Sequence, residues 1–280
     1  SSYNWFNGIL NSSQAIIANV SGITNLVVVG SDVNNCFDTT SINVQVNQLP
    51  NVIASSAFNS ICLGDSVLIS ALGALNYIWD NGAQSSSQFV KPTTIGNKTY
   101  IVNGSDVNLC SSSDTINISV NSLPIAQISA SDTNICINDT VILLSSIASS
   151  YQWNNGSTSQ SQTLILSNVG TSIFTVTIFD NNLCSATDSV IINVNNNPNI
   201  SASANNSNIC LGEDVILSAN GAVSYVWSNG VITSSQLVTP TTVASITYIV
   251  TGTDTNLCSS NAQVNIIVNP LPNTGPIFHN

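Results

Sequence analysis

The sequence repeats itself with a period of 74 residues. Its tryptophans, Trp5, Trp79, Trp153 and Trp227, are each 74 residues after the last, and each lies in a Tyr-x-Trp-x-Asn-Gly segment. A fixed period of this length indicates an array of similar structural units. The segment puts two aromatic side chains on one face of an alternating strand and ends at Asn-Gly, a strong signal for a tight β turn. Each unit is therefore predicted to be a small β domain with its tryptophan in the core.

The period predicts three complete units, at residues 51–124, 125–198 and 199–272. Each closes on a Leu-Pro or Asn-Pro pair, and proline at such a joint stops strand pairing and stiffens the link. We therefore expect the domains to lie end to end as a rod. Residues 1–50 match only the later part of a unit and lack its first strands, while residues 273–280 match the start of a unit or form a tail. We expect a cut from a longer periodic chain, or completion of 1–50 by a strand of another molecule.

Within a unit the apolar pattern predicts strands and no helix. In the first complete unit the expected strands cover residues 51–58, 67–69, 77–79, 89–90, 100–102 and 116–120, with a turn at 62–65. Ile116, Ile118 and Val120 alternate with polar residues, as in a half-buried antiparallel strand. Gly64, Asn138 and Gly212 hold one turn position that is expected to need positive φ. About seven short strands per unit favour an all-β, immunoglobulin-like sandwich.

The composition excludes two classes of partner. Charged residues make up 5% of the chain, with two lysines, no arginine and a net charge of −11. Binding nucleic acid requires clustered Lys and Arg, so nucleic acid is excluded. The sequence has no apolar run near the roughly 18 residues that a membrane span requires, so none is expected. Apolar residues still make up 43%, enough for folded cores.

The seven cysteines fall into two kinds. One kind lies at the turn after the first strand of a unit (Cys62, Cys136, Cys210) and the other just after the turn before the last strand (Cys36, Cys110, Cys184, Cys258). In a seven-strand sandwich these turns lie at opposite ends, about 25 Å apart, too far for a disulfide. We therefore prefer bridges across domain joints, Cys62 with Cys184 and Cys136 with Cys258, leaving Cys36, Cys110 and Cys210. The alternatives are pairs inside each domain (Cys62 with Cys110, Cys136 with Cys184, Cys210 with Cys258) and free thiols.

Several motifs admit a chemical and a structural interpretation. An Asp-x-Asn pair precedes each cysteine of the second kind (Asp32/Asn34, Asp106/Asn108, Asp180/Asn182, Asp254/Asn256). It could ligate calcium, but so few carboxylates favour a turn stabilised by the aspartate. The tryptophans could stack on sugars if exposed, whereas strand alternation favours the core. His279 is the single histidine, so no acid–base or nucleophilic constellation can be assembled. We expect no enzyme activity, no metal and no cofactor.

The unit Ile-Cys-Leu-Gly-Asp-x-Val, Tyr-x-Trp-x-Asn-Gly, Thr-Tyr-x-Val and Asn-Leu-Cys-Ser-Ser resembles the Ig-like and PKD-like tandem repeats of large Bacteroidetes surface proteins, including gliding-motility adhesins. The departures are Asn138 at the turn glycine and Phe174 at the tyrosine of the second-last strand. The resemblance implies secretion by the type IX system and display at the cell surface. Asp-Ser/Thr pairs also look like the O-glycosylation acceptor of that group, which would place sugars on Thr39, Ser66, Thr115, Thr140 and Ser189. The other interpretation is a polar start to a strand.

These features together predict a stalk or filament segment of a secreted cell-surface adhesin. Its partners would be neighbouring repeats or identical chains in a fibre, with surface glycans or other cells as ligands. The first alternative is a self-assembling extracellular filament whose subunits are completed by strand donation. The second is a carbohydrate-binding repeat module, which requires exposed aromatic side chains on a sheet.

Overall fold

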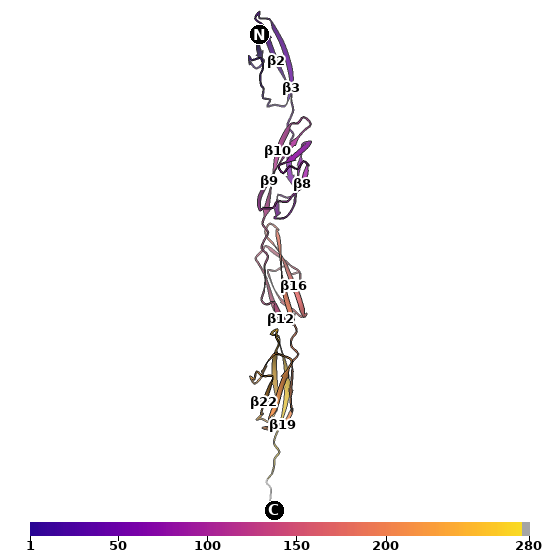
Figure 1. Cartoon of the computed structure of the whole chain (residues 1–280), viewed down its shortest axis with the longest axis vertical. Coiled ribbons are helices and arrows are strands. Elements are labelled where there is room, and N and C mark those ends of the chain that lie inside the picture. Colours follow the sequence, from indigo (N-terminus) through magenta and orange to yellow (C-terminus); the bar gives the residue numbers. More distant parts are fainter. Residues whose placement is uncertain (276–280) are drawn as a thin grey trace, which may run out of the picture. The chain divides into compact units, whose positions relative to one another are not determined.

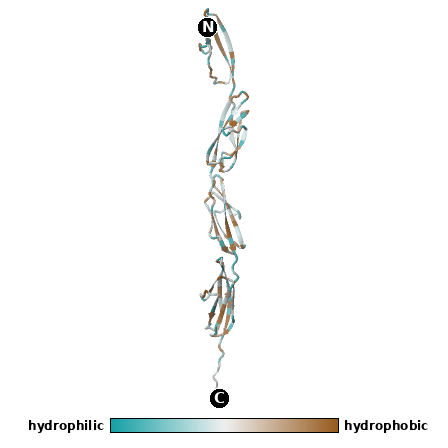
Figure 2. Ribbon diagram, viewed as in Figure 1, coloured by the Kyte–Doolittle hydropathy of each residue, from teal (hydrophilic) through white to brown (hydrophobic). Residues whose placement is uncertain are grey.

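The structure is a computed structural model that describes residues 1–275, and these residues form strands and turns without a helix (Figure 1). The chain divides into two compact units, Ser1–Leu123 and Pro124–Asn280. Hydrophobic and hydrophilic residues are mixed along the strands of both units (Figure 2). This mixing is the pattern of sheets with one buried and one solvated face. The predicted all-β fold is confirmed.

Residues 51–124 of the first unit form a sandwich of seven strands. The strands are β4 (Ile53–Ser56), β5 (Ser60–Cys62), β6 (Val67–Leu72), β7 (Asn76–Trp79), β8 (Ser87–Val90), β9 (Gly96–Ser105) and β10 (Ser111–Asn121). One sheet has the order β4-β6-β8 and the other β5-β10-β9-β7. All pairs are antiparallel except β5 with β10, which is parallel. This two-sheet arrangement is an immunoglobulin-like sandwich.

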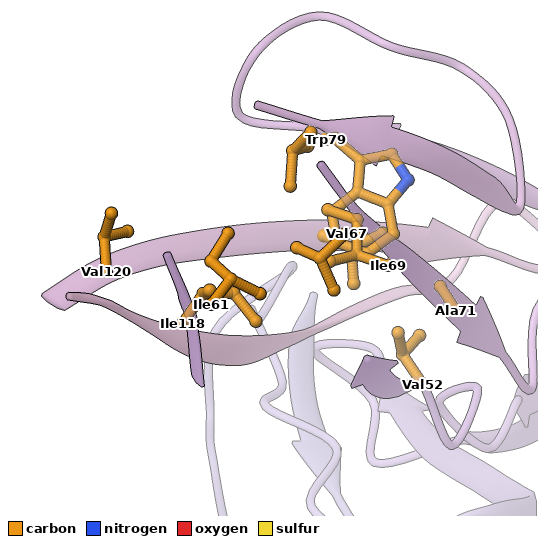
Figure 3. Packing of buried hydrophobic residues seen from close by; sticks show 10 residues of the cluster. Val52, Ile61, Val67, Ile69, Ala71, Trp79, Ile118 and Val120 are labelled. Carbon is orange, nitrogen blue, oxygen red and sulfur yellow. The ribbon is translucent and has the colours of Figure 1, made fainter. Parts of the chain in front are cut away.

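The core of this sandwich follows from the alternation of its strands. Val67, Ile69 and Ala71 of β6 are buried while their neighbours along the strand are not. They pack against Trp79 of β7 and Ile118 of β10, on the opposing sheet (Figure 3). The indole Nε1 of Trp79 donates a hydrogen bond of 2.9 Å to the Ser85 carbonyl, so the buried ring leaves no orphaned donor.

The first predicted strand, residues 51–58, is not one strand. The chain leaves the first sheet after Ser56 and joins the other sheet at Ser60. The Ala57 amide still donates to the Leu68 carbonyl of the first sheet, whereas the Asn59 carbonyl accepts from the Ser119 amide of β10. The backbone thus changes hydrogen-bonding partners within three residues. As a result, Cys62 lies at the end of a parallel edge strand.

The second unit contains two further sandwiches with the same order of strands. The first has β11 (Ile128–Ala130), β12 (Asn134–Cys136), β13 (Thr140–Ser145), β14 (Ser150–Trp153), β15 (Ser161–Ile165), β16 (Gly170–Phe179) and β17 (Ser185–Asn195). The second has β18 (Ser201–Ala204), β19 (Asn208–Cys210), β20 (Val215–Asn220), β21 (Ser224–Trp227), β22 (Ser235–Val238), β23 (Ser245–Thr253) and β24 (Ser259–Asn269). In each, a three-stranded and a four-stranded sheet enclose one core.

Residues 1–50 form a single sheet. It consists of β1 (Ser2–Trp5), β2 (Gly22–Ser31) and β3 (Phe37–Val46) in the order β1-β2-β3. These strands correspond to β7, β9 and β10 of the complete sandwich. Within the described residues no second sheet covers them, so Trp5 is only half-buried and Ile42 is exposed. Of the predicted segment 273–280, residues 276–280 lie outside the described part of the chain.

Candidate functional site

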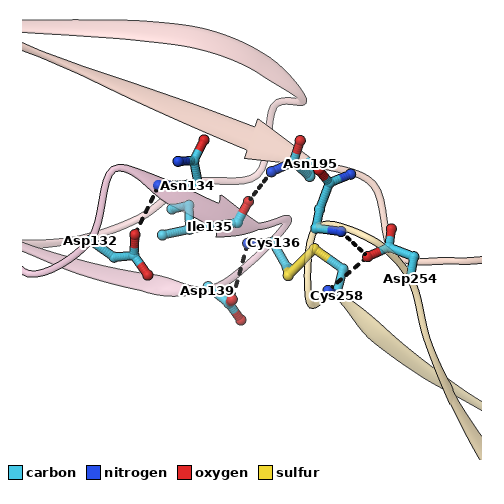
Figure 4. The surroundings of a disulfide bond; sticks show 9 residues. Asp132, Asn134, Ile135, Cys136, Asp139, Asn195, Asp254 and Cys258 are labelled. Atoms are coloured by element: carbon cyan, nitrogen blue, oxygen red, sulfur yellow. Dashed lines mark hydrogen bonds between the residues drawn. A yellow bond between two sulfur atoms is a disulfide. The ribbon is translucent and has the colours of Figure 1, made fainter. Parts of the chain in front are cut away.

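The residues with chemistry that the fold brings together are cysteines at a joint between two sandwiches. Cys136 and Cys258 form a disulfide, with Cα atoms 5.5 Å apart and 122 residues apart in sequence (Figure 4). Cys136 belongs to the sandwich at 125–198 and Cys258 to the one at 199–272. The bond crosses a domain joint, which is the arrangement that the sequence topology favours for these two cysteines.

The turn after β12 holds Cys136 in place. Cys136 pairs with Asn195 at the far end of β17. Its backbone N–H donates to Oδ2 of Asp139 at 3.1 Å, and its carbonyl accepts from the Asp139 amide at 3.0 Å. Asn138, between them, has φ of 67°, as predicted for this turn position. The sequence analysis missed the role of the acid, although an acid follows each cysteine of this kind by three residues (Asp65, Asp139, Glu213).

The turn between β23 and β24 holds Cys258. Oδ1 of Asp254 accepts from the backbone N–H groups of Asn256 and Cys258, both at 2.9 Å. The Asp254 amide in turn donates to the Cys258 carbonyl at 2.9 Å. Two short turns, each fixed by one carboxylate, therefore present the two sulfurs. Cys258 is fully buried.

Disulfides inside one domain do not fit the strand register. Cys136 is level with Asn195 at one end of β17, and Cys184 immediately precedes Ser185 at the other end. Eleven residues of extended strand separate these ends, about 35 Å at roughly 3.4 Å per residue, against the about 7 Å that a disulfide allows. The same register recurs for Cys62 against Cys110 and for Cys210 against Cys258. The intra-domain alternative is therefore wrong.

The other cysteines differ in state. Cys62 and Cys184 are not free thiols, and the pairing of one with the other stays a prediction. Cys36 is a free and exposed thiol, while Cys110 and Cys210 are free and half-buried. These three are the cysteines that the preferred scheme leaves over.

The four Asp-x-Asn motifs are turns built around the aspartate. In each, Oδ1 accepts from the backbone N–H groups two and four residues later, at 2.8 to 2.9 Å. The Cys36 amide, with help from that of Asn34, lowers the pKa of Asp32 below its ordinary value of 3.8. Within residues 1–275 no group of three or more His, Cys, Asp or Glu side chains gathers at one place. His279 lies outside the described residues.

The residues proposed as sugar acceptors are all exposed: Thr39, Ser66, Thr115, Thr140 and Ser189. The aspartates before two of them also have a structural role. Oδ2 of Asp114 accepts from the Ala54 amide at 2.7 Å, and Oδ2 of Asp188 accepts from the Ile128 amide at 2.8 Å. Each bond joins the last strand of one sheet to the first strand of the other. Glycosylation at these sites stays a prediction.

We expect the Asp114 carboxylate to make the stability of its sandwich depend on pH. The Ala54 and Thr115 amides lower its pKa below the ordinary 3.8. Because the folded-state pKa is depressed, the stabilisation is fully present above pH 3.8 and is lost as the pH falls through the folded-state pKa. Urea denaturation of the intact chain between pH 2 and 7 should show this loss, and Asp114→Asn should flatten it. An unchanged acid limb in Asp114→Asn would contradict the assignment.

The tryptophans lie where strand alternation places them. Trp79, Trp153 and Trp227 are 1%, 2% and 1% exposed. Each Nε1 donates to a backbone carbonyl six residues later, that of Ser85, Ser159 or Thr233, and Trp5 makes the same bond to Asn11. None of the three buried rings offers a face for a sugar. Within residues 1–275 there is also no helix long and apolar enough to cross a membrane.

No family model matches the sequence, and no curated protein matches it. Among solved structures, the chain is similar to the N-terminal eight Ig domains of Down syndrome cell adhesion molecule, at 11% identity and a TM-score of 0.40, covering 96% of this chain and 45% of that one. It is also similar to a Ca²⁺-stabilised adhesin with which an Antarctic bacterium binds ice (11%, 0.34, 88% and 82%). A third is the fibronectin(III)-like modules of Clostridium thermocellum CbhA (10%, 0.32, 51% and 95%). The chain thus spans less than half of the first of these, and such low scores do not bear on function.

Proposed function

We propose that this chain is a stalk segment of a secreted bacterial cell-surface adhesin, in which Ig-like domains transmit tension. The observation that carries the proposal is the disulfide between Cys136 and Cys258, which fastens one sandwich to the next. A bond across a joint adds nothing to the core of either domain. It does limit how far the two domains can separate when the chain is pulled.

The composition and the motifs support an extracellular, non-catalytic role. Structural disulfides persist in oxidising compartments such as the cell surface. The carboxylates near the joint are engaged in backbone turns, as Asp139 and Asp254 show. Export by the type IX system, a role in gliding motility and glycosylation belong to the proposal through the resemblance of the repeats. Antibodies against the chain should label intact source cells, and labelling only after permeabilisation would contradict the surface location.

A second candidate, strand donation between chains, has one observation in its favour. The face of the β1–β2–β3 sheet that is buried in the complete sandwiches forms an open apolar groove lined by Ile16, Leu26, Val44 and Val46 among others. In the complete sandwiches the strand β6 or its equivalent covers this face. A synthetic peptide of residues 59–72 should bind this groove, if donation occurs, and protect β2 amides from hydrogen exchange. A carbohydrate-binding module lacks comparable support because its required aromatic face is buried.

Pulling the intact chain by its ends should reveal the joint as missing length. The Cys136–Cys258 bond bypasses 122 residues, which at about 3.5 Å per residue is roughly 400 Å of contour length. In single-molecule force spectroscopy the oxidised chain should extend by that much less than the reduced chain. Cys210→Ser, which removes a thiol that is free in the structure, is the matched control and should change nothing. Equal extension of oxidised and reduced chains would contradict the proposal.

The same measurement tests the predicted pairing of Cys62 with Cys184. If that bond exists, it overlaps the Cys136–Cys258 loop and bypasses an equal length. Cys136→Ser alone should then leave the extension short, and Cys62→Ser combined with Cys136→Ser should release the full length. If Cys136→Ser alone releases it, the Cys62–Cys184 pairing is wrong.

A further inference from the structure

Two complementary kinds of cysteine remain free in this chain. Cys210 is of the kind that follows the short parallel strand, as Cys136 is, and Cys36 and Cys110 are of the kind that precedes the last strand, as Cys258 is. The bond between Cys136 and Cys258 shows that one cysteine of each kind can meet when two sandwiches adjoin. The question is whether the free cysteines are held in the same geometry.

Cys210 is held as Cys136 is. It pairs with Asn269 at the end of β24, as Cys136 pairs with Asn195 at the end of β17. Its backbone N–H donates to Oε2 of Glu213 at 2.9 Å, and its carbonyl accepts from the Glu213 amide at 3.1 Å. Gly212 between them has positive φ, as Asn138 has in the bonded turn. The backbone that presents the sulfur is therefore already formed.

Cys36 is held as Cys258 is. Oδ1 of Asp32 accepts from the backbone N–H groups of Asn34 and Cys36 at 2.8 and 2.9 Å, and the Asp32 amide donates to the Cys36 carbonyl at 3.1 Å. Asn35 has φ of 58°, close to the 65° of Leu257 in the bonded turn. Cys36 is exposed, whereas Cys110 is half-buried. Cys36 is thus the more accessible partner.

We propose that Cys210 of one copy forms a disulfide with Cys36 of a second copy, so that chains join covalently head to tail. The inference rests on the joint in the proposed function, and its occupant is a second copy because the bonded pair in this chain is made of the same two turns. The two thiols each lose a proton and together lose two electrons to a disulfide oxidant such as oxidised glutathione. One S–S bond forms, and two molecules of reduced glutathione leave. No other group takes part.

The test uses the full chain, purified with its internal disulfides intact and incubated with oxidised glutathione at increasing concentration. Non-reducing gel electrophoresis should show a ladder of covalent multimers that collapses on reduction, and mass spectrometry of peptides should identify a Cys36–Cys210 link. Cys36→Ser and Cys210→Ser should each abolish the ladder. Cys110→Ser is the matched control and should leave the ladder unchanged. An equimolar mixture of Cys36→Ser and Cys210→Ser should give dimers and nothing larger, since each variant keeps one complementary thiol.

Three results would overturn the inference: no multimers, links of Cys36 to Cys36 or Cys210 to Cys210, or a ladder that depends on Cys110. Peptide mapping of the same samples separates this failure from that of the proposed function. If the Cys136–Cys258 peptide is present while the ladder is absent, the joint within the chain stands and only the link between chains is wrong. If that peptide is also absent, both are wrong.

Discussion

Trp153→Ala is expected to lower the free energy of unfolding of its sandwich by about 3–5 kcal/mol, the usual cost of truncating a buried aromatic to alanine. The ring is 2% exposed and packs in one cluster with Val141, Leu143 and Ile192. Truncation would leave a cavity that both sheets line and would remove the donor to the Ser159 carbonyl. Because these domains are small, such a loss is a large share of their total stability.

The effect should be localised, because the intact chain unfolds domain by domain. Hydrogen exchange measured by mass spectrometry on peptides from β16 and β17 reports on this sandwich alone. Trp5→Ala is the matched control. Trp5 occupies the same repeat position but is half-buried on a single sheet, so its truncation should cost about 1 kcal/mol or less. An equal loss of protection around both tryptophans would show that burial of the ring is not what stabilises the repeat.

The strands and the core could be predicted because they depend on local alternation and on repetition. In β10 the inward residues Ile118 and Val120 are buried two positions apart, as their spacing requires. The two ends at which the cysteines lie also follow from the number of strands between them. Repetition turns one such local pattern into several consistent observations, which is why a period of 74 residues constrains the fold so strongly.

What could not be predicted depends on non-local pairing in segments too short to show a period. The strand β5 has three residues, and its parallel partner, Asn121 for Cys62, is 59 positions away in sequence. Neither its existence nor its sheet can be read from Ser60-Ile61-Cys62. The acids that fix the cysteine turns were missed for a related reason. Asp65, Asp139 and Glu213 look like ordinary polar turn residues until the turn is seen to hold the cysteine amide.

Repeats also hide compensating substitutions that the period alone does not explain. Gly104 of β9 is tightly enclosed, since a Cβ built there would lie 2.6 Å from Cγ2 of Val52 and 2.7 Å from Cβ of Ala74. The matching position in the next sandwich is Ile178, which is fully buried. There the residue that corresponds to Val52 is Ala126. The two repeats thus fill one space from opposite sides, one with the first segment and the other with the long strand.

Gly104→Ile should therefore lower the free energy of unfolding of its sandwich by about 3 kcal/mol or more, because overpacking of a tight core forces side chains and backbone to move. Val52→Ala alone should cost about 2 kcal/mol through the cavity that it leaves. The double variant reproduces the arrangement of the next repeat and should recover most of both losses, a coupling of about 2–3 kcal/mol in a double-mutant cycle. Gly30→Ile is the matched control, because a Cβ at Gly30 would meet no atom closer than 3.9 Å. Urea denaturation with hydrogen exchange in β9 measures all four, and additive losses in the double variant would refute the exchange of volume.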